Sequence, residues 1–160
     1  MSTEIFDKDD SAGFLANQMA RLFAAGLARR IRPLDLAPAQ FMVLLELWRQ
    51  DALSQAELVA RLDVEQATMA NTLARMERDG LIQRLPSKTD GRVRLACLTD
   101  RARALRRPAT AAARAQNAEA LAGLTPQERG AFLRMMKAVA DTMRTARDAG
   151  PPATGGARDE

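Results

Sequence analysis

The chain has 160 residues, a length that fits one compact domain with extensions, and 47% of them are hydrophobic, which is enough for a core. Aromatic residues amount to only 4%, and alanine, leucine and methionine replace them, which favours helices over sheets. The net charge is +4, histidine is absent and there is one cysteine. These counts exclude an internal disulfide and histidine-based catalysis and remove the commonest zinc ligand, so we expect no catalytic site, metal or cofactor.

The sequence also lacks the usual signals for export or membrane insertion. No apolar run reaches the ~18 residues that a membrane span needs, and no charged segment followed by an apolar one opens the chain. A single cysteine is typical of a reducing compartment. We therefore expect a cytoplasmic protein that has no membrane among its partners.

The first predicted element is a long helix that follows a flexible polar tail at 1–10. It begins at Ser11, a candidate N-cap, and ends at Arg32, because Pro33 stops it. Its apolar residues recur at steps of three and four and form a stripe wider than one core face needs. The stripe is thus expected to make one contact inside the subunit and one outside it. It comprises Phe14, Leu15, Met19, Leu22, Phe23, Leu27 and Ile31.

Three helices are predicted next. The first spans 38–50, with proline suited to its first turn. The second is short and begins with a capping box in which Ser54 and Glu57 satisfy each other's backbone donors. The third spans 65–79, and its tight connection to the second is typical of a helix-turn-helix. The buried side of the first of these helices is expected to hold Phe41, Leu44, Leu45 and Trp48.

Two strands, 81–86 and 93–98, are predicted after this motif, with the Asp90-Gly91 turn signal between them. A helix rich in alanine and arginine follows at 100–122, in which Pro108 is expected to cause a kink. A hairpin that follows a helix-turn-helix is typical of a winged helix.

The last predicted helix begins with a second capping box, Thr125 to Glu128, and runs to Asp148. Its apolar residues lie on one side, as do those of the first helix, and a lone winged helix would need neither stripe. We therefore predict that both ends of the chain associate in a homodimer, the alternative being that they only complete a monomer core. The residues expected at the dimer interface are Phe14, Leu15, Phe132, Met136, Val139 and Met143.

These elements predict a mainly α (α+β) fold, a winged helix-turn-helix with a two-stranded wing. The DNA-binding lobe is expected at 37–99, and the helical dimerisation module at 11–36 and 100–148. Flexible tails are expected at 1–10 and 149–160.

The wing region resembles the signature of the multiple-antibiotic-resistance regulator (MarR) family of bacterial repressors. Asp90-Gly91-Arg92 and then Leu95-Ala96-Cys97-Leu98-Thr99 are similar to the family's Asp-x-Arg wing tip and Leu-x-x-Leu-Thr strand end. The stretch 73–82 resembles the end of its recognition helix, and the whole resemblance runs from Phe14 to Met143. The family usually carries a second arginine where this chain has Gly91, which implies weaker wing contacts here.

The exposed face of helix 65–79 carries small and polar residues, as a helix that enters the major groove requires. Gln66, Thr68 and Asn71 are expected to read bases, with Ala67 allowing close approach and Arg75 contacting a base or a phosphate. The alternative is an ordinary solvated helix face. Around this helix we expect phosphate contacts from Ser54, Gln55, Arg84, Lys88 and Arg94. Arg92 is expected to contact the minor groove. The resemblance implies that Asp90 orients the Arg92 side chain.

The resemblance further implies a site for small aromatic acids or phenols between the dimer helices and the DNA-binding lobe. Its candidate lining comprises Met19, Arg21, Phe23, Phe41, Leu44 and Trp48, although these residues also fit ordinary core packing with a solvated Arg21. Cys97 raises the hypothesis of a redox sensor. The chain contains no second thiol to form a disulfide with it, and a lone thiol of this kind is usually inert.

The sequence thus predicts a DNA-binding transcriptional regulator, a repressor that binds a pseudo-palindromic operator as a homodimer and is released by a small aromatic ligand. Its partners would be double-stranded DNA, a second copy of itself and that ligand. The alternatives are a constitutive DNA-binding protein without an effector and a Cys97-based redox sensor. Nothing in the sequence supports an enzyme, because it contains no thiol pair, phosphate loop or metal-ligand cluster.

Overall fold

The computed structural model describes residues 7–150, which divide into two compact units, 7–118 and 119–150. The first unit opens with a 3-10 turn at Lys8–Asp10 and the long helix α1 (Ala12–Ile31). Residues 8–10 therefore have regular structure where a flexible tail was expected, whereas residues 1–6 and 151–160 lie outside the described part. The predicted N-cap is confirmed, because Ser11 Oγ accepts a hydrogen bond from the Phe14 amide.

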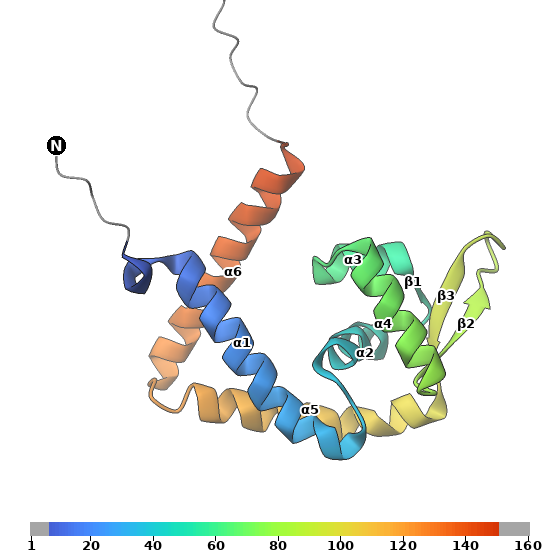
Figure 1. Ribbon diagram of the computed structural model, residues 1–160, viewed down its shortest axis with the longest axis horizontal. Coiled ribbons are helices and arrows are strands. Elements are labelled where there is room, and N and C mark those ends of the chain that lie inside the picture. Colours follow the sequence, from blue (N-terminus) through green and yellow to red (C-terminus); the bar gives the residue numbers. More distant parts are fainter. Residues whose placement is uncertain (1–6, 151–160) are drawn as a thin grey trace, which may run out of the picture. The chain divides into compact units, whose positions relative to one another are not determined.

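The central helices follow a second 3-10 turn, Arg32–Leu34, which carries the proline that ends α1. They are α2 (Pro38–Arg49), α3 (Gln55–Leu62) and α4 (Gln66–Arg78), and Figure 1 shows α3 and α4 as neighbours above α2. The predicted capping box of α3 is present, since Ser54 Oγ accepts from the Glu57 amide at 3.2 Å and Glu57 Oε2 accepts from the Ser54 amide at 2.8 Å. The predicted helix-turn-helix is thus confirmed.

The sheet has one strand more than predicted. Strands β2 (Ile82–Pro86) and β3 (Arg94–Leu98) form the expected antiparallel hairpin, and the two-residue strand β1 (Leu53–Ser54) pairs with the other edge of β3. Periodicity could not reveal β1, because two residues carry no alternation. The turn also differs from an Asp-Gly hairpin turn, because seven residues separate β2 from β3 and Gly91 does not adopt a positive φ.

Helix α5 (Asp100–Ala120) leads away from β3 and passes through Pro108 as one continuous helix. It closes the core of the first unit from below α2 (Figure 1), where the Trp48 indole donates a hydrogen bond to the Ala102 carbonyl at 3.0 Å. The core itself joins all the helices of the lobe to the base of the sheet. Its fully buried side chains include Ile31, Leu44, Leu47, Leu53, Leu58, Met69, Leu73, Met76, Leu81 and Ile82.

The second unit consists mainly of α6 (Pro126–Asp148), which begins at the predicted capping box of Thr125 and Glu128. None of the residues of α6 is buried, although Phe132 is half-buried. Its exposed apolar residues include Leu133, Met136, Val139 and Met143, and the last of these is 68% exposed. Among the described residues, α6 therefore presents an exposed apolar stripe.

Candidate nucleic-acid interface and apolar cavity

Helix α4 has one buried side and one polar side. Its buried side carries Met69, Leu73 and Met76, which anchor it to the core. The residues predicted to face DNA are all exposed: Gln66 at the N-terminus of the helix, and Ala67, Thr68, Asn71 and Arg75. Because the apolar positions recur every three to four residues, burying them leaves these polar residues pointing to solvent.

The N-termini of α3 and α4 are joined by a hydrogen bond that the sequence did not reveal. Gln55 Nε2 donates to Gln66 Oε1 at 3.1 Å, so the two candidate contact residues lie next to each other. Ser54 is engaged differently, since its hydroxyl donates to the Glu57 carboxylate at 2.8 Å. Two hydrogen bonds that the Glu57 carboxylate accepts lower its pKa below the ordinary value. The bond from the Ser54 backbone amide has the larger effect, and the bond from the Ser54 hydroxyl adds to it.

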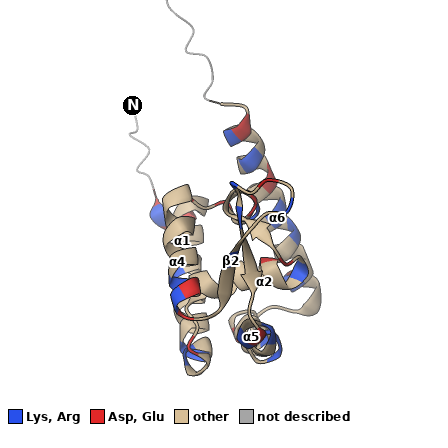
Figure 2. Cartoon of the chain, turned by 90° about the vertical axis from the view of Figure 1, so that its right-hand side faces the viewer, with Lys and Arg blue, Asp and Glu red and all other residues tan. Residues whose placement is uncertain are grey.

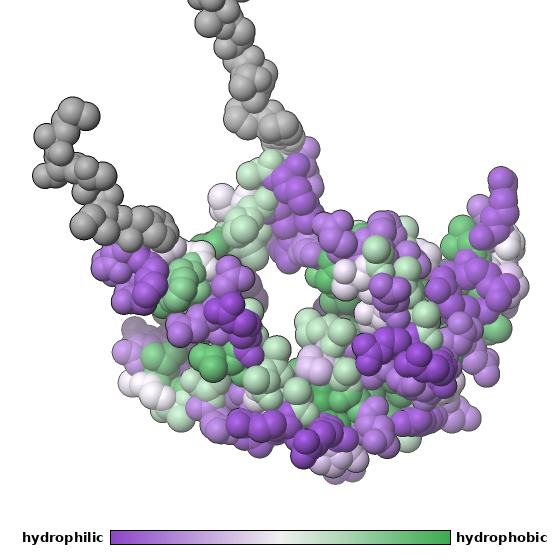
Figure 3. Space-filling view, in the orientation of Figure 1, coloured by the Kyte–Doolittle hydropathy of each residue, from purple (hydrophilic) through white to green (hydrophobic). Residues whose placement is uncertain are grey.

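The wing tip brings Asp90 and Arg92 together. Asp90 Oδ1 accepts a hydrogen bond from the Arg92 amide at 3.0 Å and lies 3.6 Å from its Nε, while the Arg92 side chain is 95% exposed. Lys88 and Arg94 are also exposed, and Arg84 is half-buried. Figure 3 shows that the end of the hairpin is hydrophilic, and Figure 2 shows that acidic residues accompany the basic ones on this side.

The base of the wing is tied to α2 and α5 by a residue that sequence reasoning missed. Asp51 Oδ1 accepts a hydrogen bond from the Leu98 amide at 2.9 Å, and its Oδ2 accepts one from Arg103 at 2.8 Å. The C-terminal end of α4 has a similar tie, because the buried Gln40 donates to Asp79 Oδ2 at 2.8 Å. No local motif marks these pairs, since their partners are 39 to 52 residues apart.

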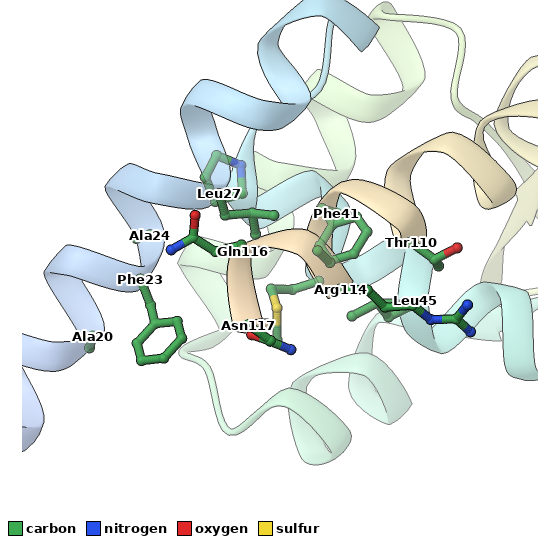
Figure 4. A pocket seen from close by; sticks show the side chains of 13 residues that line it. Ala20, Phe23, Ala24, Leu27, Phe41, Leu45, Thr110, Arg114, Gln116 and Asn117 are labelled. Atoms are coloured by element: carbon green, nitrogen blue, oxygen red, sulfur yellow. The ribbon is translucent and has the colours of Figure 1, made fainter. Parts of the chain in front are cut away.

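A cavity of about 680 Å³ lies between α1, α2 and α5 (Figure 4). Helices α1 and α2 supply apolar walls, and all the polar residues of the lining come from α5. The lining comprises Ala20, Phe23, Ala24, Leu27, Pro38, Phe41, Met42, Leu45, Thr110, Ala113, Arg114, Gln116 and Asn117.

Two of the six residues expected around a ligand, Phe23 and Phe41, line this cavity. The other four do not. Leu44 and Trp48 are buried in the core, while Met19 is half-buried and Arg21 exposed on α1, outside the lining. The residues of α2 that line the cavity are 38, 41, 42 and 45. Residues 44 and 48 lie on the neighbouring face of the same helix.

Cys97 lies half-buried on β3. Burial is the largest cause that raises the pKa of its thiol, and the nearby Asp51 carboxylate raises it further, whereas Arg103 lowers it. A raised pKa keeps the thiol protonated, which disfavours the redox hypothesis. Within residues 7–150 no group of three or more histidine, cysteine, aspartate or glutamate side chains is placed to bind a metal, and no helix there is long and apolar enough to cross a membrane.

Comparison with known proteins agrees with this architecture. Residues 36–93 match the MarR family model. The chain is 33% identical over 129 residues to an HTH-type transcriptional repressor of Mycobacterium tuberculosis. The matched segment covers 81% of this chain and 93% of that protein. Such relatives are transcriptional regulators rather than enzymes.

Solved structures show the same similarity. A mutant MarR from Escherichia coli complexed with operator DNA is 25% identical, with a TM-score of 0.78, over 86% of this chain and 99% of that one. BpsR from Bordetella bronchiseptica, whose DNA binding is regulated by 6-hydroxynicotinic acid, is 26% identical, with a TM-score of 0.79, over 85% of this chain and 97% of that one. The family predicted from the wing residues is confirmed, and the chain belongs to the MarR family of winged-helix transcriptional regulators.

Proposed function

We propose that this regulator is a repressor that binds a pseudo-palindromic operator as a homodimer and that a small aromatic ligand releases it. The observation that carries the DNA-binding part is the exposed polar face of α4 beside the wing with its projecting Arg92. A helix with short polar side chains fits the major groove, and an arginine on a hairpin tip fits the narrow minor groove beside it.

The type of DNA contact proposed for each residue of α4 follows from the chemistry of its side chain. Gln66, Thr68 and Asn71 can donate to and accept from base edges, and an amide can pair with adenine through two hydrogen bonds. Arg75 would contact guanine or a phosphate. Helix α4 also carries Glu77, so most of the electrostatic attraction would come from the wing and the neighbouring helices.

Dimerisation would cover the apolar residues that the single chain exposes. These residues are Leu15 on α1 and Met136, Val139 and Met143 on α6. An exposed apolar stripe of this kind is typical of an association surface. A two-fold dimer would present two copies of α4 to successive major grooves, about 34–36 Å apart.

The cavity between α1, α2 and α5 supports the ligand-responsive part. Its wall includes α2, which is linked to α4 through Gln40 and Asp79. A ligand that changes the spacing of these helices would therefore shift α4 relative to its groove. The similarity to BpsR, which 6-hydroxynicotinic acid regulates, also favours a small aromatic effector.

Footprinting on the DNA upstream of the protein's own gene tests this proposal. We expect one protected region with two half-sites one helical turn apart, and protection that aromatic acids reduce. A protected region that no compound in a panel of aromatic acids affects would favour the constitutive alternative. The absence of any sequence-specific protection would overturn the proposal.

A further inference from the structure

The polar side of the apolar cavity contains one nearly buried amide, that of Gln116 on α5. Gln116 is 8% exposed and belongs to the cavity lining. Figure 4 shows its side chain directed toward α1, beside Ala24 and Leu27. A polar side chain this deeply buried needs partners, because an unpaired amide costs free energy in an apolar environment.

One end of this amide has a partner on α1. Arg30 Nε donates a hydrogen bond to Gln116 Oε1 at 3.2 Å. Because a guanidinium can only donate, the amide oxygen must face Arg30, and this fixes which way round the amide lies. The two N–H donors of Nε2 therefore point away from Arg30.

The other end of the amide has no hydrogen-bond partner in the part of the chain that the structure describes. Among the described residues Gln116 Nε2 makes no hydrogen bond, and it is not sealed inside the protein, since no fully buried side-chain nitrogen or oxygen there lacks a partner. Because Gln116 belongs to the cavity lining and its nitrogen keeps some exposed surface, this nitrogen is a donor still available for a ligand there.

Gly26 on α1 makes this arrangement possible. A Cβ at position 26 would lie 2.5 Å from the amide carbon of Gln116, far inside contact distance. The absence of a side chain lets the amide lie flat against α1. Gly26 and Arg30 together hold the donor in one place before any ligand arrives, and such preorganisation lowers the entropy cost of binding.

We propose that Gln116 determines the ligand class of this cavity by donating a hydrogen bond to a carbonyl or carboxylate oxygen on an aromatic body. The body would pack against Phe23, Phe41 and Leu45, and its acceptor edge would face α5. No acidic residue occurs among the described residues of the lining and Arg114 is cationic, so a cationic ligand finds no carboxylate to pair with. This inference rests on the proposed function, because it assigns the chemistry of the same effector cavity.

The test uses three probes that share a phenyl ring: acetophenone, a neutral acceptor; benzoate, an anionic acceptor; and benzylamine, a cationic donor at neutral pH. Binding to the full-length, DNA-free protein can be followed by the fluorescence of Trp48, the only tryptophan, whose ring lies 6.1 Å from that of Phe41 in the cavity wall. We expect acetophenone and benzoate to bind at least about tenfold more tightly than benzylamine.

Gln116→Glu is the decisive variant, because it keeps the shape and the acceptor for Arg30 but removes both N–H donors. We expect it to weaken acetophenone binding by about tenfold and to reverse the preference in favour of benzylamine. Gln116→Met, which is apolar and of similar length, should reduce the preference without reversing it. Gln83→Glu, the same chemical change on the exposed face of β2, should bind all three probes as the parent does.

The inference is overturned if the parent prefers benzylamine or binds no probe, or if the folded Gln116→Glu variant keeps the parent's preference. Should neither Gln116 variant fold, the order of the three probes on the parent decides. Binding of the operator is measured separately on the parent. Operator binding without probe binding would overturn this inference alone, and the expected probe order without operator binding would overturn the proposed function alone.

Discussion

The carboxylate of Asp51 joins the C-terminal end of α2 to Arg103 on α5 through a hydrogen bond of 2.8 Å. Its other oxygen accepts the backbone N–H of Leu98 at 2.9 Å, so one side chain connects two helices with the last residue of the wing. The lobe that presents α4 and the wing is therefore fixed by polar contacts as well as by its core.

We expect Asp51→Ala to lower the free energy of unfolding by about 1–3 kcal/mol, because it leaves the Leu98 amide without its acceptor. Arg103→Ala should cost less than about 1 kcal/mol, since it removes only solvent-exposed ion pairs, those with Asp51 and Asp100. Urea denaturation followed by circular dichroism measures both. Equal losses for the two variants would show that the ion pair rather than the backbone contact stabilises the wing.

The local elements of this fold were predictable, whereas its long-range contacts were not. The capping box of Ser54 and Glu57 and the apolar periodicity of α4 involve neighbours in sequence, and both are present. The contact between Asp51 and Arg103 spans 52 residues, and no local pattern around either residue indicates it. Long-range polar contacts depend on the final packing, which a single sequence does not display.

The cavity illustrates a second limit. Helix α2 is apolar on most of its circumference, so its periodicity could not tell the face with Phe41 and Leu45 from the face with Leu44 and Trp48. Two of the six candidate lining residues, Leu44 and Trp48, therefore lie on the neighbouring face of α2 rather than in the cavity. Gln116 lies in a helix rich in alanine and arginine, where no local signal distinguishes a cavity residue from a solvated one.

At the wing tip, Arg92→Ala should weaken DNA binding and lower its dependence on salt. A dimer would lose two arginines, so the slope of log K against log salt concentration should fall by up to about 2. Titrations of a labelled operator by fluorescence anisotropy at several salt concentrations measure this slope. The control is Arg106→Ala, which removes an exposed arginine from α5, away from the wing. A similar fall in both variants would mean that only the overall charge matters.

The exposed apolar stripe of α6 predicts that Val139→Glu dissociates the proposed dimer. A carboxylate at an apolar interface loses its hydration without gaining a partner, so association should weaken by at least about 100-fold. Sedimentation velocity over a range of protein concentrations measures the dissociation constant. Ala138→Glu adds the same charge on the opposite side of α6 and should remain dimeric. Dimers of undiminished stability in Val139→Glu would place the interface elsewhere.

The thiol of Cys97 should react slowly with iodoacetamide at pH 8. Its pKa is raised above the ordinary value, so at any pH below that raised pKa a smaller fraction is thiolate than in a free cysteine. The rate of alkylation as a function of pH, followed by mass spectrometry, should give a midpoint above that of free cysteine. A midpoint below it would revive the redox hypothesis, as would loss of operator binding in peroxide that Cys97→Ser prevents.

The central claim is that the exposed face of α4 reads the operator sequence, and Asn71→Ala tests it most directly. The measurement compares the affinity of the parent and the variant for the footprinted operator and for a scrambled duplex at the same salt concentration. We predict that the variant loses about 1–3 kcal/mol on the operator and almost nothing on the scrambled duplex, because Asn71 contributes base contacts rather than charge. Equal affinities of parent and variant for the operator, or equal losses on both duplexes, would contradict this account of α4.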